Sequence, residues 1–336
     1  MGPSLGRANN AFMTPLVSII LPTFERAALL EGVLRDLVSQ PLSAIEVLVM
    51  DDGSTDDTAA RIAAIADPRV AYWNLGRLGV SAAINEGLGR SSAPYVMFLH
   101  DHDQISPDLL TALVDVLDRN PTASFAFCGY AFFDSDLRVE RERWLFDFPE
   151  LIPGREFLED TLMPRINSPV LALSMIRRSA LEGGVLDTSI GGCADVELWH
   201  RLSATGDVAY VPRILINVRG RDESSQFASP GATLDLMANI LRVKHRFLKL
   251  LPDRDRARVR KGWRHQVDMG GGYVAWKALE ANDRETFRQS GRTIALFGSR
   301  WGSWVFRLLD RLPTQFTRAL LRTIRSVALL RRRSTL

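Results

Sequence analysis

Cysteine and long apolar runs are scarce in this sequence. Only Cys128 and Cys193 occur in 336 residues, too few and too far apart for a disulfide framework or a zinc motif. We therefore expect a reducing, cytosolic setting. No run of about 18 apolar residues is present, which argues against a spanning helix. Residues 1–14 lack the apolar core of a signal peptide, and we expect them to be a flexible lead.

Acidic residues become sparse towards the C-terminus. Residues 241–336 hold 23 Lys and Arg against 7 Asp and Glu, whereas residues 1–240 hold 19 against 32, which together give the formal net charge of +3. An acidic N-terminal part and a strongly basic C-terminal part indicate two regions with different roles. The length suits two domains, or one domain with an appendage.

Short apolar, β-branched runs alternate with segments of helical periodicity. We expect strands at residues 16–21, 45–50, 70–73, 95–99, 123–133, 168–176 and 206–212. Between the first four we expect helices at residues 26–39, 59–66 and 79–88, and another follows at 106–117. Strands alternating with helices of this length predict an α/β fold with a doubly wound, mostly parallel sheet and helices on both faces.

Carboxylates stand at the ends of two of these strands, where ligands bind in open α/β sheets. Asp101 and Asp103 follow residues 95–99 at a spacing that can hold a divalent cation, although both could equally be solvated turn residues. Asp52 follows residues 45–50 and can accept hydrogen bonds from a nucleobase or ribose. Capping of the next helix is the alternative for the residues of that turn.

Three segments, residues 16–26, 46–56 and 98–107, resemble the family 2 glycosyltransferases in order and separation. The resemblance covers about residues 15–120. It implies the GT-A fold, a nucleotide-diphosphate sugar donor and transfer with inversion. We accordingly expect a GT-A domain at residues 15–230, with a nucleotide-sugar half at 15–120 and an acceptor half at 121–230. A basic α-helical C-terminal region at 231–336 would follow it.

The resemblance also assigns roles to individual positions. Asp52 would accept a hydrogen bond from the base, and Asp101 and Asp103 would form the family's metal motif for Mg²⁺ or Mn²⁺, with Asp103 the more direct ligand. His102 stands where the family often has another aspartate, and imidazole shifts the preference towards manganese or other transition metals. The remaining donor contacts would come from four consecutive residues: Pro22, Thr23, Phe24 and Glu25.

An inverting transfer needs one base that takes the proton of the acceptor hydroxyl. Asp195 matches the aspartate of the family's Glu-Asp-X-Asp/Glu-Leu segment, with Ala194 in place of the glutamate and Glu197 as the second candidate. Acidic residues in a first helical turn also have a purely structural explanation. Arg221 stands where many members have a histidine. It could pair with the diphosphate, or belong to an ordinary solvated turn.

The C-terminal region shows basic amphipathic patterns, interrupted by an expected break at residues 268–272. Residues 301–333 suit an interfacial helix on anionic lipid, or a helical tail folded on the catalytic domain. No nucleic-acid recognition motif accompanies the charge. Trp144, Phe146 and Phe148 alternate along the chain, and we expect them to pack under a loop rather than to stack on sugars.

The hypothesis from sequence is a metal-dependent inverting glycosyltransferase that extends a glycan or lipid-linked acceptor. It would be cytoplasmic, with peripheral attachment to the cytosolic face of the membrane. The alternative is a non-catalytic nucleotide-sugar-binding or scaffolding module with a degenerate site, which His102, Ala194 and Arg221 suggest. A nucleotidyltransferase is a third option, but residues 22–26 do not form the glycine-rich phosphate loop that it would carry after the first strand.

Overall fold

A computed structural model describes residues 14–311 except 167, 172, 184–185 and 221–228. The chain folds into two compact units. Unit 1 comprises residues 1–162 and 168–221, and unit 2 comprises residues 163–167 and 222–336. Each unit is described by itself.

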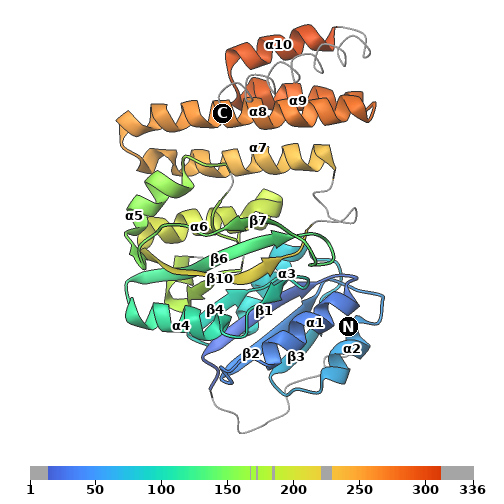
Figure 1. Ribbon diagram of the computed structural model, residues 1–336, viewed down its shortest axis with the longest axis vertical. Coiled ribbons are helices and arrows are strands. Elements are labelled where there is room, and N and C mark those ends of the chain that lie inside the picture. The colour runs from blue at the N-terminus through green and yellow to red at the C-terminus, as the bar shows by residue number, and fades with distance from the viewer. Residues whose placement is uncertain (1–13, 167, 172, 184–185, 221–228, 312–336) are drawn as a thin grey trace. The chain divides into compact units, whose positions relative to one another are not determined.

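Unit 1 is built on one mixed sheet in the order β3-β2-β1-β4-β9-β6-β10-β5, with β7 paired to β6 and β8 to β10 (Figure 1). Strands β1, β2, β3 and β4 pair in parallel, as do β6 and β10. The strands span β1 Val17–Thr23, β2 Ile45–Asp51, β3 Val70–Asn74, β4 Tyr95–Phe98, β5 Gln104–Ile105, β6 Ala123–Phe133, β7 Glu140–Trp144, β8 Leu151–Ile152, β9 Met175–Arg177 and β10 Asp207–Val218.

Helices cover both faces of this sheet, as alternate residues of β1 show. Ile19 and Leu21 belong to a core cluster with buried side chains of helices α1, α2 and α4. Ile20 points the other way, against Gly87 of α3, where an added Cβ would lie 2.6 Å from its Cγ2. The helices of unit 1 span α1 Ala27–Val38, α2 Thr58–Ile65, α3 Val80–Arg90, α4 Leu109–Arg119, α5 Gly154–Glu156 and α6 Ala194–Thr205, with a short π-helix at η1 Phe157–Leu162 and short 3-10 helices at η2 Arg178–Gly183 and η3 Thr188–Cys193. This is the GT-A arrangement expected from the sequence.

One expected strand is largely absent. The apolar run at residues 168–176 forms a strand only at Met175–Arg177, which pairs antiparallel with both β4 and β6. Apolar character alone predicted a longer strand. The described residues before Met175 are instead irregular, and Leu173 is buried in the core cluster without a strand partner.

The alternating aromatics after β6 pack against one another, as expected. The Trp144 ring stacks on Tyr130 with centroids 5.8 Å apart, and the Phe146 ring stacks on Phe148 at 5.2 Å. Phe148 also meets Tyr210 of β10 edge to face. These aromatic pairs stabilise the second half of the sheet.

Unit 2 is helical over its described residues. Its helices span α7 Pro230–Phe247, η4 Leu248–Leu250, α8 Asp253–Glu280, α9 Arg284–Phe297 and α10 Arg300–Asp310. Residues 163–166 join this unit through α8: Trp263 Nε1 donates to the Met163 carbonyl at 2.6 Å, and Gln266 bonds both the Pro164 carbonyl and the Ile166 N–H. Within the described ranges, no helix is long and apolar enough to cross a membrane.

The break expected at residues 268–272 was wrong, because α8 runs through this segment without interruption. Three consecutive glycines disfavour a helix by propensity. Gly271, however, faces α9, where an added Cβ would lie 2.9 Å from Ile294 Cγ1. The missing side chain lets the two helices approach closely, and this packing offsets the low propensity.

Candidate functional site

The loops that follow β1, β2 and β4 meet at one edge of the sheet because these strands are parallel and adjacent. In register, Pro22 pairs with Met50 and Thr23 with Asp51. The loop after β4 lies beside them, since Thr23 Oγ1 donates a hydrogen bond to Asp101 Oδ2 at 2.8 Å. The predicted donor residues of the three segments therefore share one site.

Asp52 organises the approach to α3. Its Oδ1 accepts hydrogen bonds from the backbone N–H groups of Leu78 at 2.6 Å and Gly79 at 2.8 Å. Asp51 is buried and accepts from Tyr72 Oη at 2.7 Å, an environment that raises the pKa of Tyr72 to about 12 through burial and the neighbouring carboxylate. Asp51 is therefore hydrogen-bonded to Tyr72 of β3, whereas Asp52 lies in the turn that follows β2.

Glu25 and Phe24 form the other side of this region. The Glu25 backbone lies in the left-handed region at φ 54°, and its Oε1 accepts from Thr55 N at 2.8 Å and Thr55 Oγ1 at 2.9 Å. The Phe24 side chain is exposed, and the guanidinium of Arg77 lies 3.6 Å from its ring centroid. Glu25 thus joins two loops, and Phe24 offers an aromatic surface beside a cation.

Gly53 is required by the turn between these elements. Its φ is +89°, and an added Cβ would lie 3.1 Å from the carbonyl carbon of Gly76. Both the backbone conformation and the close approach of the two turns favour glycine here.

Asp101 is buried and has three partners. Besides the hydroxyl of Thr23, Arg26 Nη1 donates to Oδ1 at 3.2 Å, and His102 Nδ1 lies 2.8 Å from the same oxygen. Burial by itself would raise the pKa of Asp101, but the imidazole and the guanidinium outweigh burial and hold that pKa below its usual range. The carboxylate is therefore ionised and fixed by residues of two loops.

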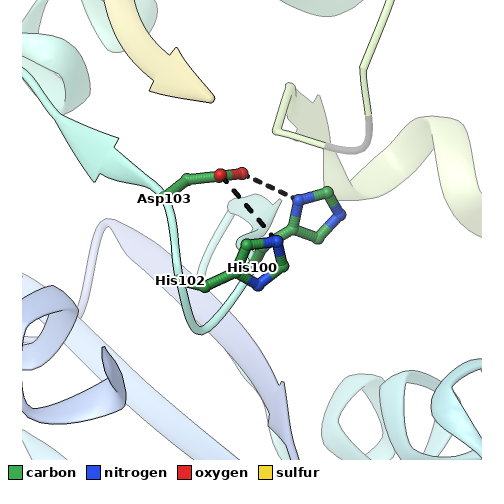
Figure 2. A group of neighbouring side chains, drawn as sticks. All are labelled: His100, His102 and Asp103. Carbon is green, nitrogen blue, oxygen red and sulfur yellow. Dashed lines mark hydrogen bonds and ion pairs between the residues drawn. The ribbon is translucent and has the colours of Figure 1, made fainter. Parts of the chain in front are cut away.

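The Asp103 carboxylate faces two imidazoles, those of His100 and His102, as Figure 2 shows. Its Oδ2 is 2.9 Å from His100 Nδ1, and its Oδ1 is 3.9 Å from His102 Nε2. The two rings stack at 5.3 Å with 4° between their planes. One donor atom from each of the three residues lies within 4.8 Å of the others, a group that can hold a metal ion.

Arg219, directly after β10, fixes this loop from the opposite side. Its backbone N–H donates to Asp103 Oδ1 at 2.9 Å, and its Nε donates to the carbonyl of His102 at 2.9 Å. The guanidinium also bonds the carbonyl of Ser135. The sequence alone did not indicate a role for Arg219, because it lies 116 positions from Asp103. Arg221 lies outside the described residues.

Asp195 lies in the first turn of α6, after the short 3-10 helix Thr188–Cys193. Burial raises the pKa of Asp195, and the charge of His100 acts on it in the opposite direction. Glu197, two residues on in the same turn, forms an ion pair with Arg201 at 3.2 Å. The charges of Asp195 and His100 thus influence each other, although the two residues come from distant segments.

The model of the family described as "Glycosyl transferase family 2" matches residues 18–184. This chain belongs to that family. An uncharacterised glycosyltransferase of Rickettsia typhi is 24% identical over 212 residues, which cover 62% of this chain and 65% of that protein. A GalNAc(5)-diNAcBac-PP-undecaprenol beta-1,3-glucosyltransferase of Campylobacter jejuni is 30% identical over 132 residues, 38% of this chain and 40% of that protein.

The chain spans just under two thirds of the length of the first curated relatives. Two solved structures share the fold. TarS 1–349 of S. aureus matches with a TM-score of 0.59 at 16% identity, covering 94% of this chain and 92% of its own. The mannosyltransferase PcManGT of Pyrobaculum calidifontis, in complex with GDP-Man and Mn²⁺, matches with a TM-score of 0.54 at 17% identity over 98% and 90%.

Proposed function

We propose that this protein transfers a sugar from a nucleotide-diphosphate sugar to an acceptor hydroxyl with inversion. The observation that carries the proposal is the convergence of the loops after β1, β2 and β4 at one edge of the sheet. The Thr23 hydroxyl donates to Asp101, the Thr23 carbonyl accepts from the N–H of Asp52, and a group of side chains able to hold a metal ion follows β4. Membership of the family and the names of its relatives support the same reaction.

The donor would bind along the loops after β1 and β2. The nucleoside would lie against Pro22, Thr23, Phe24 and Glu25, with the nucleobase donating a hydrogen bond to Asp52. Arg77, stacked on Phe24, supplies a cation next to this surface, and Arg221 would pair with the diphosphate. The complex of PcManGT with GDP-Man supports a nucleotide sugar as donor.

A divalent cation, Mg²⁺ or Mn²⁺, would be held in the loop after β4. The donor set fits one, because an ionised carboxylate and two imidazoles converge there. When bound, the cation would neutralise the negative charge that develops on the departing nucleotide diphosphate. The Mn²⁺ in PcManGT supports the assignment.

Asp195 would act as the base. It would accept the proton of the acceptor hydroxyl as that oxygen attacks the anomeric carbon from the face opposite the nucleotide. An ordinary aspartate is a weak base. Burial raises the pKa of Asp195 and so makes its ionised form a stronger proton acceptor.

The acceptor would be a glycan or a lipid-linked sugar, in line with the undecaprenol compound in the name of the Campylobacter relative. Helix α10 of unit 2 suits a membrane surface. Trp301, Trp304 and Leu308 lie on one helical face with 70%, 51% and 47% of their surface exposed, and the first two rings stack at 5.1 Å. Aromatics beside arginines suit anionic lipid, and the protein would act at the cytosolic face of the membrane.

The reaction is tested by calorimetric titration with a panel of UDP- and GDP-sugars, with and without Mn²⁺, followed by hydrolysis and transfer assays. We expect Asp195→Asn to bind the donor like the wild type and to lose transfer. The matched variant Glu197→Gln should keep most of the activity. Donor binding without turnover in the wild type would favour the non-catalytic module. Full activity of Asp195→Asn would exclude this base.

Membrane attachment is tested by co-sedimentation with vesicles of phosphatidylglycerol and of phosphatidylcholine. We expect binding to the anionic vesicles, weakened at least tenfold by Trp301→Ser with Trp304→Ser. Tyr273→Ser, at another exposed aromatic of unit 2, should leave binding unchanged. Equal binding by both variants would remove α10 from the proposal.

A further inference from the structure

Asp101 and Asp103 have different surroundings although they form one Asp-X-Asp pair. The Asp101 carboxylate is engaged at both oxygens by residues of its own site: Thr23 at Oδ2, and Arg26 and His102 at Oδ1. A cation at Asp101 would have to displace these donors and approach an arginine. Asp103 is also engaged at both oxygens, by His100 Nδ1 at Oδ2 and by the backbone N–H of Arg219 at Oδ1, but among the described residues no arginine side chain pairs with it, and its carboxylate faces the two imidazoles. The position of a cation is therefore biased towards Asp103.

The orientation of His102 suits coordination through Nε2. Its Nδ1 lies 2.8 Å from Asp101 Oδ1 and 3.4 Å from Arg26 Nη1, and the shorter contact, to a carboxylate, is the distance of a hydrogen bond in which the imidazole N–H donates. That bond would leave the lone pair on Nε2, the atom that points towards Asp103. A carboxylate that fixes the tautomer of a metal-bound histidine is a recurrent arrangement in metalloproteins.

His100 completes the group beside His102. Its ring is parallel to that of His102, and its Nδ1 lies 2.9 Å from Asp103 Oδ2. Its side chain is 40% exposed, whereas that of Asp103 is fully buried. A cation in this loop would therefore have a buried carboxylate behind it and an imidazole at the solvent side, where a diphosphate can approach.

We propose that the cation is coordinated by His100, His102 and Asp103, and that Asp101 is an outer-sphere residue that orients His102. Two imidazoles and one carboxylate make a softer donor set than carboxylates alone. Such a set favours Mn²⁺, Co²⁺ or Zn²⁺ over Mg²⁺, which prefers oxygen ligands. The inference rests on the proposed function only for the role of the cation at the diphosphate.

The test uses the full chain with an affinity tag that contains no histidine. Mn²⁺ binding is measured from the EPR signal of the free ion, with and without UDP or GDP. The bound ion is then examined by electron spin echo envelope modulation, which detects directly coordinated imidazole ¹⁴N. We expect ¹⁴N modulation in the wild type, and Zn²⁺ should displace Mn²⁺ at far lower concentration than Mg²⁺ does.

Variants separate the ligands from the outer-sphere residue. His102→Ala and His100→Ala should each weaken Mn²⁺ binding at least tenfold and reduce the ¹⁴N modulation. Asp101→Asn should weaken binding about tenfold while the modulation persists. His102→Asp should lose modulation and gain affinity for Mg²⁺. His265→Ala, at an exposed histidine of α8, is the control and should match the wild type, and circular dichroism confirms that each variant is folded.

The inference is overturned if bound Mn²⁺ in the wild type shows no ¹⁴N modulation, or if no Mn²⁺ binds with or without nucleotide. It is also overturned if Asp101→Asn abolishes binding while His100→Ala and His102→Ala do not affect it. Metal coordination is read independently of transfer. Imidazole-bound Mn²⁺ in a protein without transferase activity would support this ligand set and contradict the proposed function. Sugar transfer by a protein whose bound Mn²⁺ shows no imidazole coordination would contradict this ligand set and support the proposed function.

Discussion

Asp52, in the turn after β2, accepts a hydrogen bond at 2.8 Å from the backbone N–H of Gly79, 27 positions further along the chain. The same oxygen accepts from the N–H of Leu78. Gly79 has φ +87° and directly precedes α3. The carboxylate that the sequence proposes for the nucleobase therefore also fixes the segment that leads into α3.

Substitutions at Asp52 separate these two roles. Asp52→Ala removes the acceptor of both N–H groups, and we expect it to weaken nucleotide binding about tenfold, equivalent to about 1.4 kcal/mol, and to speed amide exchange at residues 76–80. Asp52→Asn keeps an acceptor oxygen and should leave the exchange unchanged. Calorimetry and hydrogen exchange measure the two effects. Equal rates of amide exchange in the two variants, together with weakened nucleotide binding, would show that Asp52 acts only by contacting the nucleobase.

The pH dependence of transfer should reflect Asp195. Burial raises its pKa above the usual aspartate range, and the proposed base acts only when ionised. We therefore expect kcat/KM for the acceptor to fall with decreasing pH, with a midpoint above that of an ordinary aspartate. Circular dichroism across the same range controls for unfolding. A rate that stays constant down to the ordinary aspartate range would argue against a buried base at this position.

The same burial should destabilise the fold at neutral pH. Because the folded protein holds the proton of Asp195 more tightly than the unfolded chain does, stability falls as pH rises from the unfolded pKa through the folded one. Asp195→Asn should therefore raise the free energy of unfolding at pH 7.5 by about 1 kcal/mol. The gain should vanish below the unfolded pKa.

Thermal melts in EDTA measure this difference without a contribution from bound metal. Glu197→Gln is the control. It loses the ion pair with Arg201 and should show no such gain. A lower melting temperature for Asp195→Asn at pH 7.5 would contradict the sign of the shift.

Neighbouring glycines of α8 provide a matched test of the packing in unit 2. A Cβ at position 271 would lie 2.9 Å from Ile294 Cγ1, whereas a Cβ at position 272 would meet nothing within 4 Å. We expect Gly271→Ala to destabilise the protein by about 1–3 kcal/mol. Gly272→Ala should stabilise it by up to about 1 kcal/mol, because alanine favours the helix. Urea denaturation of both variants checks the prediction, and equal effects would argue against close contact of α8 with α9.

Local patterns predicted most elements of unit 1. The apolar run at residues 123–133 coincides with β6, and the strands at the site end within a few residues of their expected limits. Periodicity works here because the central strands β2 and β4 are buried on both faces, whereas each long helix is buried mainly on one. Prediction from local pattern failed at residues 168–174, whose described part contains buried side chains but no strand. It also failed at residues 268–272, where contact with α9 outweighs the low helix propensity of glycine.

The sequence by itself determined which carboxylates follow the strands, because strand ends are a property of local hydrophobic patterning. Asp52, Asp101 and Asp103 could therefore be placed at one edge of a parallel sheet, while their individual roles could not be separated. Only the tertiary structure decided that Asp101 is held by Thr23 and Arg26, while Asp103 meets His100 and the backbone of Arg219. The physical reason is that most of these partners lie 75 to 116 positions apart in sequence and become neighbours only when separate loops converge.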